Sequence, residues 1–326
     1  MTTPAHQVTT TARGTSIDIS PWTITSTTCP ISNAPEISAI QKELNGLPLP
    51  EMPFGNNSLV IRNANSDWEY TFNIVEALRL VKMGPLDPGD GGVQVGYAKE
   101  WLKSRTDPNS ANPLPTSFFA KQFDWTYTTT YVGHITSSTP PQFIPADPNN
   151  PSHQIPIEEL SRPDPILFYT EIPLFEDELH DNGSASLIIR ARVMPTSFFV
   201  LSRFSLRVDG VLFRLHDTRI YHSFVSSPPF IVRETSGWEA PYSSVKRFLP
   251  SPDLSPLTDP NFVHNVLTSL PKSTTQDPKR AGGTGWRGLG TKIEVLYLNT
   301  SDPPSHSELD SNTESPDATE GAKVIN

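Results

Sequence analysis

The sequence predicts an α+β protein in which antiparallel strands outnumber helices, and two observations support this prediction. Three apolar segments of strand length follow one another closely, at 184–194, 197–208 and 211–222. Fewer segments carry apolar residues at helical spacing, and the clearest of these is 73–82. The chain also has 34 prolines and 36% hydrophobic residues, so part of it is expected to stay outside the core, because proline interrupts helices and central strands.

The N-terminal half alternates predicted strands with predicted helices. Residues 1–20 are polar and have no pattern, so we expect them to be disordered. The next elements are predicted in the order helix 35–46, strands 58–63 and 67–72, helices 73–82 and 96–105, and strand 123–131. Gly46 stops the first helix, and Asn73 caps the second. The strict alternation of 123–131 puts its aromatic residues on one face, which either joins the core or lines a binding groove.

The C-terminal half begins with a proline-rich loop at 139–165 and a strand at 165–175. The three long strands named above follow it. From residue 250 the composition shifts to Pro, Ser, Thr, Asp and Asn, which is typical of disorder. A short helix is predicted at 260–270, and 291–298 is predicted to return to the core as a strand or a helix.

The dipeptide Asp209-Gly210 is a strong hairpin signal, because a two-residue type I′ turn needs positive φ at both positions. Such a turn fixes the register of the two strands beside it. It pairs Val208 with Val211, Leu206 with Phe213 and Phe204 with Leu215 on one apolar face. On the other face it pairs Arg207 with Leu212, Ser205 with Arg214 and Arg203 with His216.

This register gathers arginines on one sheet face of an otherwise acidic protein. The predicted set is Arg190, Arg192, Arg203, Arg207 and Arg214. Arginine binds carboxylates and phosphates through two parallel hydrogen bonds, so this face is a candidate site for an acidic ligand. The alternative is a solvated outer face with local ion pairs.

Charge and cysteine content narrow the function classes. The formal net charge is −10, and half of it lies in residues 301–326, which argues against binding a nucleic-acid backbone. The one cysteine, Cys29, excludes an intramolecular disulfide, as expected in a reducing compartment. No secretory signal and no membrane-spanning apolar segment is visible, so we expect a soluble, intracellular protein.

The acidic stretch Phe175–Gly183 is the most conspicuous candidate for a metal or catalytic site. A calcium-binding loop is excluded because the position of the closing carboxylate falls on Ile189. Alternation along a strand sends Glu176 and Glu178 to one face and Asp177 to the other, which favours a solvated turn or an interaction surface. The alternative is a metal-dependent hydrolase that combines the acids of 176–181 with His216 or His222.

Two weaker motifs are assigned structural roles. Gly283, Gly285 and Gly288 have dinucleotide-binding spacing, but they lack the preceding strand and following helix that such a site needs. His216 and Asp217 alternate to opposite faces of their strand, so we expect His216 to be hydrogen-bonded rather than part of a metal site. The sequence therefore predicts no catalytic residue, no resident metal and no cofactor.

Six phrases together resemble one protein family. They are PWTIT (21–25), LPEMPFGNNSLVI (49–61), EWLKSRT (100–106), FDWTYTTTY (123–131), LFEDELHDNG (174–183) and RVMPTSFFVLSRFSLRVDGVLFRLHDTRIYH (192–222). In this order they resemble the TIP forty-one-like family of TOR signalling regulators, over roughly residues 21–249. The Pro/Ser-rich segments at 133–165 and 250–326 depart from the animal form and look like a fungal elaboration.

The resemblance implies a non-catalytic regulator with curved antiparallel sheets and a few packed helices. Such a regulator binds catalytic subunits of type 2A-like Ser/Thr phosphatases, with a cleft for the phosphatase's C-terminal tail, and pairs with a second phosphatase-associated regulator. By motif matching, the cleft positions are Glu76, Ile155, Leu215 and Asp217. Glu76 is an Asp and Leu215 a Met in the animal pattern. The predicted register instead places Leu215 in the core, so the cleft and the arginine face remain alternative tail sites.

The resemblance also gives the expected organisation and place of action. A disordered N-terminus at 1–20 precedes a single phosphatase-binding domain at 21–249, which carries the proline-rich insertion. Residues 250–326 form a mostly disordered acidic tail with one ordered element at 286–298. The family role predicts a cytoplasmic protein that also enters the nucleus. A sharper hypothesis has Glu176, Asp177 and Glu178 approach the metal-bearing active site of the phosphatase, because metal cations attract carboxylates.

Overall fold

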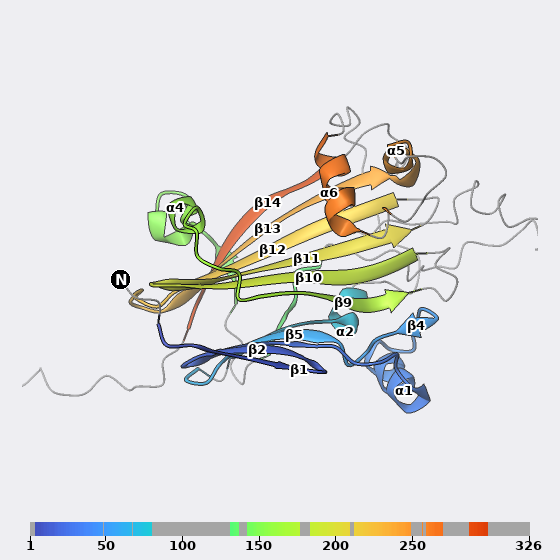
Figure 1. Ribbon diagram of the computed structural model, residues 1–326, viewed down its shortest axis with the longest axis horizontal. Coiled ribbons are helices and arrows are strands. Elements are labelled where there is room, and N and C mark those ends of the chain that lie inside the picture. Colours follow the sequence, from blue (N-terminus) through green and yellow to red (C-terminus); the bar gives the residue numbers. More distant parts are fainter. Residues whose placement is uncertain are drawn as a thin grey trace, which may run out of the picture.

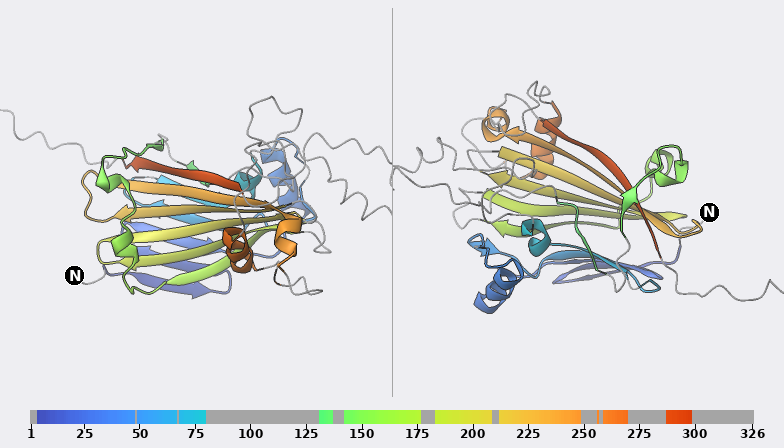
Figure 2. Two further views of the ribbon diagram at one scale, coloured as in Figure 1. Left: turned by 90° about the horizontal axis from the view of Figure 1, so that it is seen from above. Right: turned by 180° about the vertical axis from the view of Figure 1, so that it is seen from behind.

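The described part of the protein is built from two antiparallel sheets that lie face to face as two layers (Figure 1). This computed structural model describes residues 4–47, 49–66, 68–79, 131–136, 142–176, 183–208, 212–248, 256, 259–269 and 287–298. Helices lie at one end of the layers and on the outer face of the larger sheet (Figure 2). The α+β class with predominant antiparallel sheets is confirmed.

The smaller sheet has six strands. Their spatial order is β1 (Gln7–Thr11), β2 (Gly14–Ile19), β3 (Trp22–Thr27), β5 (Ser58–Asn63), β6 (Trp68–Asn73) and β7 (His134–Thr136). Alternation decides which side chains are buried, because successive residues of a strand point to opposite faces: Trp22 and Ile24 are buried, whereas Thr23 is not. Gly14 begins β2 at a φ of 143°, and an added Cβ would lie 1.8 Å from the carbonyl oxygen of Ser26, so only glycine fits there.

The larger sheet has eight strands. Their spatial order is β4 (Met52–Pro53), β9 (Phe168–Glu176), β10 (Gly183–Met194), β11 (Ser197–Val208), β12 (Leu212–Ser223), β13 (Phe230–Pro241), β14 (Arg287–Tyr297) and β8 (Ile144–Pro145). Its inner face packs on the smaller sheet, and helices cover both ends of its outer face (Figure 2). Strands buried on both faces carry apolar residues at both parities.

The predicted β11–β12 register is wrong by one residue. Val208 pairs with Leu212, Arg207 with Phe213, and Arg203 with Asp217, so three residues rather than two separate the strands. A shift of one residue exchanges the faces of a strand. The prediction assumed one apolar face on each strand, whereas both faces of β12 are buried, so the apolar pattern did not distinguish the two registers.

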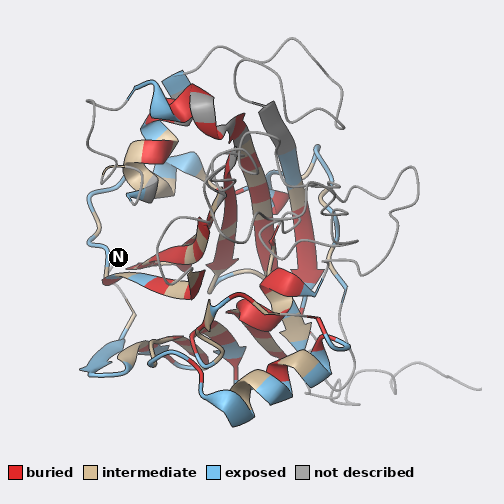
Figure 3. Cartoon of the chain, turned by 90° about the vertical axis from the view of Figure 1, so that its right-hand side faces the viewer, coloured by how far each residue is buried: buried red, intermediate tan, exposed pale blue. Residues whose placement is uncertain are grey.

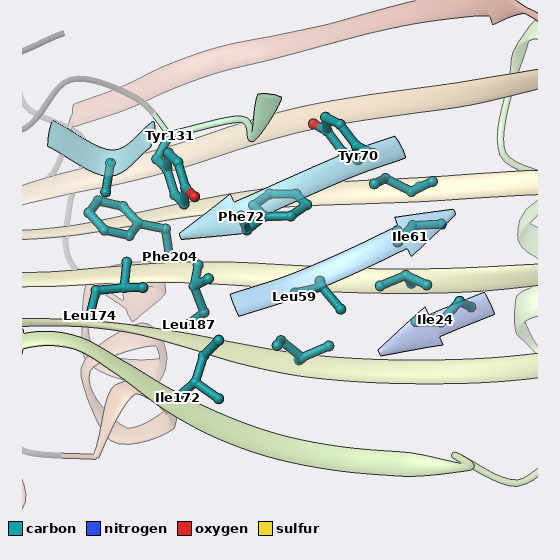
Figure 4. Close-up of a cluster of buried hydrophobic side chains, with 14 of the residues drawn as sticks. Ile24, Leu59, Ile61, Tyr70, Phe72, Tyr131, Ile172, Leu174, Leu187 and Phe204 are labelled. Atoms are coloured by element: carbon teal, nitrogen blue, oxygen red, sulfur yellow. The ribbon is translucent and has the colours of Figure 1, made fainter. Parts of the chain in front are cut away.

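The main hydrophobic core fills the space between the two sheets (Figure 3). Figure 4 shows its centre, where Leu59 and Phe72 from the smaller sheet face Leu187 and Phe204 from the larger one. Trp22 packs edge-on against Trp68 and Phe198, with ring centroids 5.7 and 5.0 Å apart. Residues from both sheets therefore share one core.

Two short helices flank the smaller sheet. Helix α1 (Ala34–Glu43) begins at a capping box in which the Asn33 side chain accepts from the Glu36 N–H and Glu36 accepts from the Asn33 N–H. Helix α2 (Ile74–Leu78) begins at Asn73, whose side chain accepts from the Glu76 N–H. The Asn73 cap of α2 was predicted from the sequence, and the start of α1 was predicted one residue late, at residue 35, without its cap.

The outer face of the larger sheet is covered at its two ends by different elements. The 3-10 helix η1 (Pro151–His153) and helix α4 (Ile157–Leu160) lie at one end, and α5 (Tyr242–Lys246) and α6 (Pro260–Ser269) at the other (Figures 1 and 2). The prediction of a helix at 260–270 is confirmed, and 291–298 proves to be part of a strand.

The N-terminal prediction is wrong, because β1 and β2 occupy much of the segment expected to be disordered. Their Thr-rich sequences bury only one face of β2 and no side chain of β1, so the apolar signal was weak. Strand β13 was not predicted. The helix at 96–105, the segment 123–130, the turn at Asp209-Gly210 and the tail 301–326 lie outside the described residues. Within the described residues, no helix is both long and apolar enough to cross a lipid bilayer.

Candidate partner-binding site

Asp217 forms the centre of a charged network on the outer face of the larger sheet. It lies in the middle of β12, and its side chain is 0% exposed. Arg203, directly opposite on β11, donates from Nε to Oδ1 at 2.7 Å and from Nη2 to Oδ2 at 2.9 Å. Arg219 donates from Nη2 to Oδ2 at 3.1 Å. Two guanidinium groups thus balance the charge of one buried carboxylate. A single cationic partner seldom offsets the desolvation cost of a buried carboxylate in full.

The network continues across the neighbouring strands. Arg219 Nη1 also donates to Glu234 Oε1 on β13 at 3.2 Å and to Ser236 Oγ at 2.9 Å. On β10, Arg190 donates to Asn261 Oδ1 at 3.1 Å, and its guanidinium carbon lies 5.3 Å from the ring centre of Tyr169. We call the set Arg190, Arg203, Arg219, Asp217 and Glu234 the arginine band.

The band has more cationic than anionic groups and remains open to solvent in part. Three guanidinium groups face two carboxylates, and the partners of Arg190 are an amide and an aromatic ring. The side chains of Arg203 and Arg219 are 11% and 25% exposed. Arginines held in place by their neighbours can bind a further carboxylate or phosphate with little loss of side-chain entropy.

An apolar cluster lies on each side of the band. Phe213 and Leu215 pack under α5 and α6 with Tyr242, Val245 and Val263. At the other end, Ile155 packs with four residues of the sheet, namely Met194, Tyr221, Val232 and Val295. The hydrogen bond from Arg190 to Asn261 of α6 places this helix beside the band, and burial together with the charge of Arg203 lowers the pKa of His264 on the same helix. The band therefore lies between two covered ends (Figure 2).

A model of the TIP41-like family matches residues 52–246. The chain belongs to the TIP41-like family. The Saccharomyces cerevisiae protein named "Type 2A phosphatase activator TIP41" is 39% identical over 240 residues, which cover 71% of this chain and 64% of the relative. The Homo sapiens "TIP41-like protein" is 37% identical over 248 residues, 76% of this chain and 83% of the relative. The Schizosaccharomyces pombe "Type 2A phosphatase activator tip41" is 34% identical over 241 residues, 74% and 88% of the two chains.

In this TIP41-like protein, three of the four positions suggested by the family resemblance lie on the outer face of the larger sheet or pack against it. Asp217 is in the band, Leu215 belongs to the cluster on one side of it, and Ile155 to the cluster on the other. Leu215 is fully buried, as predicted, but it packs in the cluster under α5 and α6. The wrong register had placed it beside Phe204. Its neighbours in the cluster therefore include residues of α5 and α6, outside the sheet.

The fourth position, Glu76, belongs to the other layer. Its carboxylate accepts from Arg79 Nη2 at 2.7 Å, and Arg79 also reaches Glu43 at 2.9 Å. The bond to Glu76 raises the pKa of Arg79. Tyr131 connects the two layers through its side chain and its backbone. Its hydroxyl donates to the Asn73 carbonyl at 2.8 Å, and its backbone carbonyl oxygen lies 3.1 Å from His216 Nδ1.

The predicted arginine face is correct for four of its five members. Arg190, Arg192, Arg203 and Arg207 share the outer face, but Arg214 points to the inner face because of the register shift. Arg192 donates to the carbonyl oxygens of Leu160 and Arg162, and so anchors the segment around α4. Arg219 was not predicted as part of this face, although its position two residues after Asp217 places it there.

The histidines that the hydrolase alternative requires point into the core. His216 faces Tyr131, and burial lowers its pKa to about 4. His222 lies 2.8 Å from the carbonyl oxygen of Phe230 and packs on Trp22, and burial lowers its pKa as well. Glu176 ends β9, whereas Asp177 and Glu178 lie outside the described residues. No three His, Cys, Asp or Glu side chains gather at metal-binding distance among the residues that the structure describes.

Proposed function

We propose that this TIP41-like protein is a non-catalytic regulator that binds catalytic subunits of type 2A-like Ser/Thr phosphatases and acts in TOR signalling. The observation that carries the proposal is membership of a family in which two fungal relatives are named type 2A phosphatase activators. The matched segment spans just under two thirds of the Saccharomyces cerevisiae relative, so the activity of that whole protein is extended to this chain as part of the proposal.

The arginine band is the proposed contact for the C-terminal tail of the phosphatase. A chain terminus ends in a carboxylate, and the guanidinium groups of Arg190, Arg203 and Arg219 offer the forked donors that carboxylates accept. The band also contains Asp217, one of the cleft positions that the family resemblance suggests, and we propose that the cleft and the arginine face form one site. This overlap supports the proposal.

Buried Leu215 and Ile155 are proposed to act on the tail site indirectly. Each lies in an apolar cluster that holds helices against the sheet beside the band, and neither is exposed enough to offer a large contact surface. Loss of either side chain is expected to displace the helices that border the band. Glu76 is proposed to contribute through Tyr131, which joins the start of α2 to β12.

A binding titration against a type 2A catalytic subunit, intact and without its C-terminal tail, tests the proposal. We expect tight binding to the intact subunit and weaker binding after tail removal. Arg190→Gln is the best variant of the band, because its described partners are neutral and its loss leaves Asp217 balanced. We expect about tenfold weaker binding, since a hydrogen bond to a charged group contributes about 1.5 kcal/mol.

Arg62→Gln is the matched control, because Arg62 is an exposed arginine of the smaller sheet, paired with Glu69. Its affinity should equal that of the unaltered protein. Binding that is unaffected both by tail removal and by Arg190→Gln would be compatible with the proposed regulatory role but would rule out the arginine band as the tail site. No binding to any type 2A catalytic subunit would reject the proposed function.

The acidic stretch is proposed as a second contact, near the metal-bearing active site of the phosphatase. Charge reversal of Glu176, Asp177 and Glu178 to Lys should then weaken binding, because a carboxylate cluster is attracted to metal cations. An unchanged affinity in the same titration would eliminate this contact and leave the tail site untouched.

The cellular parts of the proposal follow from the family role. We propose that the protein works in the cytoplasm and also in the nucleus, together with a second phosphatase-associated regulator. Imaging of the tagged full chain tests the first part, and co-purification of the two regulators with the phosphatase tests the second. Loss of the protein should change the phosphorylation of TOR-dependent substrates, and an unaltered pattern would separate it from that pathway.

A further inference from the structure

The four edges of the two sheets differ in how they are protected. Strands β4 and β8 each have two residues, one of which is a proline, and β7 has three residues. Short edge strands and prolines hinder pairing with another chain. The fourth edge, β1 (Gln7–Thr11), has five residues and none of these features.

Strand β1 presents an uncharged edge, and each of its residues is exposed. Its sequence, QVTTT, contains no charged residue and no proline, and all five residues are exposed, with Val8 at 40%. It pairs with β2 in continuous register from Gln7↔Asp18 to Thr11↔Gly14, without a bulge. Threonine and valine favour strands, and charges, prolines and bulges are the usual means by which an edge is kept from pairing.

The geometry of the β1–β2 hairpin shows which main-chain groups face outward. Thr11 and Gly14 flank a two-residue turn, and the pair that closes such a turn exchanges both of its hydrogen bonds. Hydrogen-bonded pairs then alternate along the ladder, so Thr9 also bonds to β2, whereas Val8 and Thr10 direct their N–H and C=O groups away from it. In the described part of the chain, no strand pairs with this outer edge.

We propose that the outer edge of β1 pairs antiparallel with β1 of a second copy of this chain, about a twofold axis at Thr9. This register places Val8 opposite the partner's Thr10 and Thr10 opposite the partner's Val8, so the outward main-chain groups of both copies meet as hydrogen-bonded pairs. The two six-stranded sheets then join into one continuous sheet across the axis.

A second copy fits this edge for reasons of length, charge and side-chain pairing. It supplies an edge of equal length with no charge, so no like charges meet anywhere along the contact. The two copies of Thr9 face each other as a non-hydrogen-bonded pair, in which side chains approach most closely and threonine pairs are favourable. On the outer face of the sheet, the row of side chains that crosses the strands from Thr9 continues through Ser16 and Thr25, which hydrogen-bond each other at 3.2 Å.

The contact is small, so the dimer is expected to be weak. Two five-residue edges bury far less than the roughly 800 Å² per partner of a standard interface. The dimer therefore forms at high protein concentration or where the protein is held locally. Residues 7–11 also lie outside the segment matched by the family model, on the layer opposite the arginine band, so the two contacts do not overlap (Figure 1).

A charge-swap experiment by sedimentation velocity on the full chain tests the proposal. The unaltered protein should sediment increasingly fast as its concentration rises from low to high micromolar. Thr9→Lys and Thr9→Glu should each sediment as monomers, because two like charges meet at the twofold axis. An equimolar mixture of the two variants should recover the dimer, because a lysine then faces a glutamate.

Two more variants complete the test. Thr10→Pro removes an outward N–H without touching the β1–β2 ladder, and should also sediment as a monomer. Thr25→Lys places the same charge on the same sheet face but on interior strand β3, and should dimerise like the unaltered chain. A monomeric unaltered protein at the highest concentration, or a dimer that Thr9→Lys and Thr10→Pro leave intact, would overturn the proposal.

Discussion

Asp217 is a buried carboxylate whose charge is balanced by two guanidinium groups, Arg203 and Arg219. Removal of one partner of a buried pair leaves an uncompensated charge, which costs several kcal/mol. We expect Arg203→Met to lower the free energy of unfolding by about 3 kcal/mol, because Arg219 retains one contact to Asp217. Urea denaturation at neutral pH measures this change.

The exposed pair of Arg62 and Glu69 provides the comparison on the other layer. Arg62→Gln should change the free energy of unfolding by less than about 1 kcal/mol, because exposed ion pairs are well solvated.

In the double variant Arg203→Met/Asp217→Leu the loss of unfolding free energy should be smaller than the sum of the losses in the two single variants. Additive losses would show that the two side chains do not stabilise each other.

His216 gives the fold a dependence on pH. Burial lowers the pKa of His216 from its ordinary value near 6.5 to about 4. The unfolded chain therefore binds a proton between these values that the folded chain excludes, so the stability present above pH 6.5 is lost as the pH falls toward 4. We expect the free energy of unfolding to fall by about 3 kcal/mol over this range from His216 alone.

Thermal or urea unfolding at a series of pH values measures this loss. In His216→Asn the pH dependence should be weaker by that amount, whereas the shift at His222, also toward a lower pKa, remains in both proteins. An unchanged pH profile in the variant would place the proton uptake elsewhere.

At the scale of elements, Tyr131 connects α2 with the larger sheet. Its hydroxyl accepts from the Asn73 N–H and donates to the Asn73 carbonyl, while its backbone carbonyl faces His216 on β12. Tyr131→Phe should lower the free energy of unfolding by about 1–2 kcal/mol, since both Asn73 groups lose a buried partner. Hydrogen exchange should show the largest loss of protection at residues 73–78, and a loss confined to β12 would contradict this role.

The sequence predicted elements well where one residue decides the local structure. Asn73 marked the start of α2, and the strand at 58–63 was placed at its observed bounds, whereas the first helix ends at Glu43, three residues before the predicted stop at Gly46. These features depend on neighbours in the chain, such as a capping side chain or an alternating face. The sequence alone therefore contains the information that fixes them.

The register of β11 and β12 could not be obtained in the same way. Asp209-Gly210 is a genuine turn signal, but two or three intervening residues are both compatible with it. The choice depends on which face of β12 meets the smaller sheet. Phe213 and Leu215 are apolar because α5 and α6 cover them. These helices are distant in sequence, so the local pattern around the two residues did not indicate that this face is covered.

At the scale of the whole molecule, the candidate site depends on contacts distant in the chain. The arginine band joins strands β10, β11, β12 and β13, and its border includes Asn261 of α6 and Ile155 beside α4. The sequence supplied the residue types and part of the face. It did not supply Glu234, because β13 was not recognised, and it misplaced Arg214 because the register was shifted.

The two layers have a common core, yet they present separate surfaces. The core includes side chains of both sheets, and Arg233 of β13 joins them further by donating to Glu294 and to the hydroxyl of Tyr70. The outer edge of β1 belongs to one layer and the arginine band to the outer face of the other (Figure 1). Each surface can therefore be altered without touching the other.

Because the outer edge of β1 and the arginine band are separate surfaces, we predict that self-association and phosphatase binding are independent. Thr9→Lys should abolish the dimer and bind a type 2A catalytic subunit with unchanged affinity, because Thr9 lies on the layer opposite the band. Arg190→Gln should show the reverse, with an intact dimer and about tenfold weaker binding. Sedimentation velocity and the titration, run on the same two preparations, measure both properties. If Thr9→Lys lost both properties together, either the phosphatase would bind only the dimer or its contact would extend to the smaller sheet.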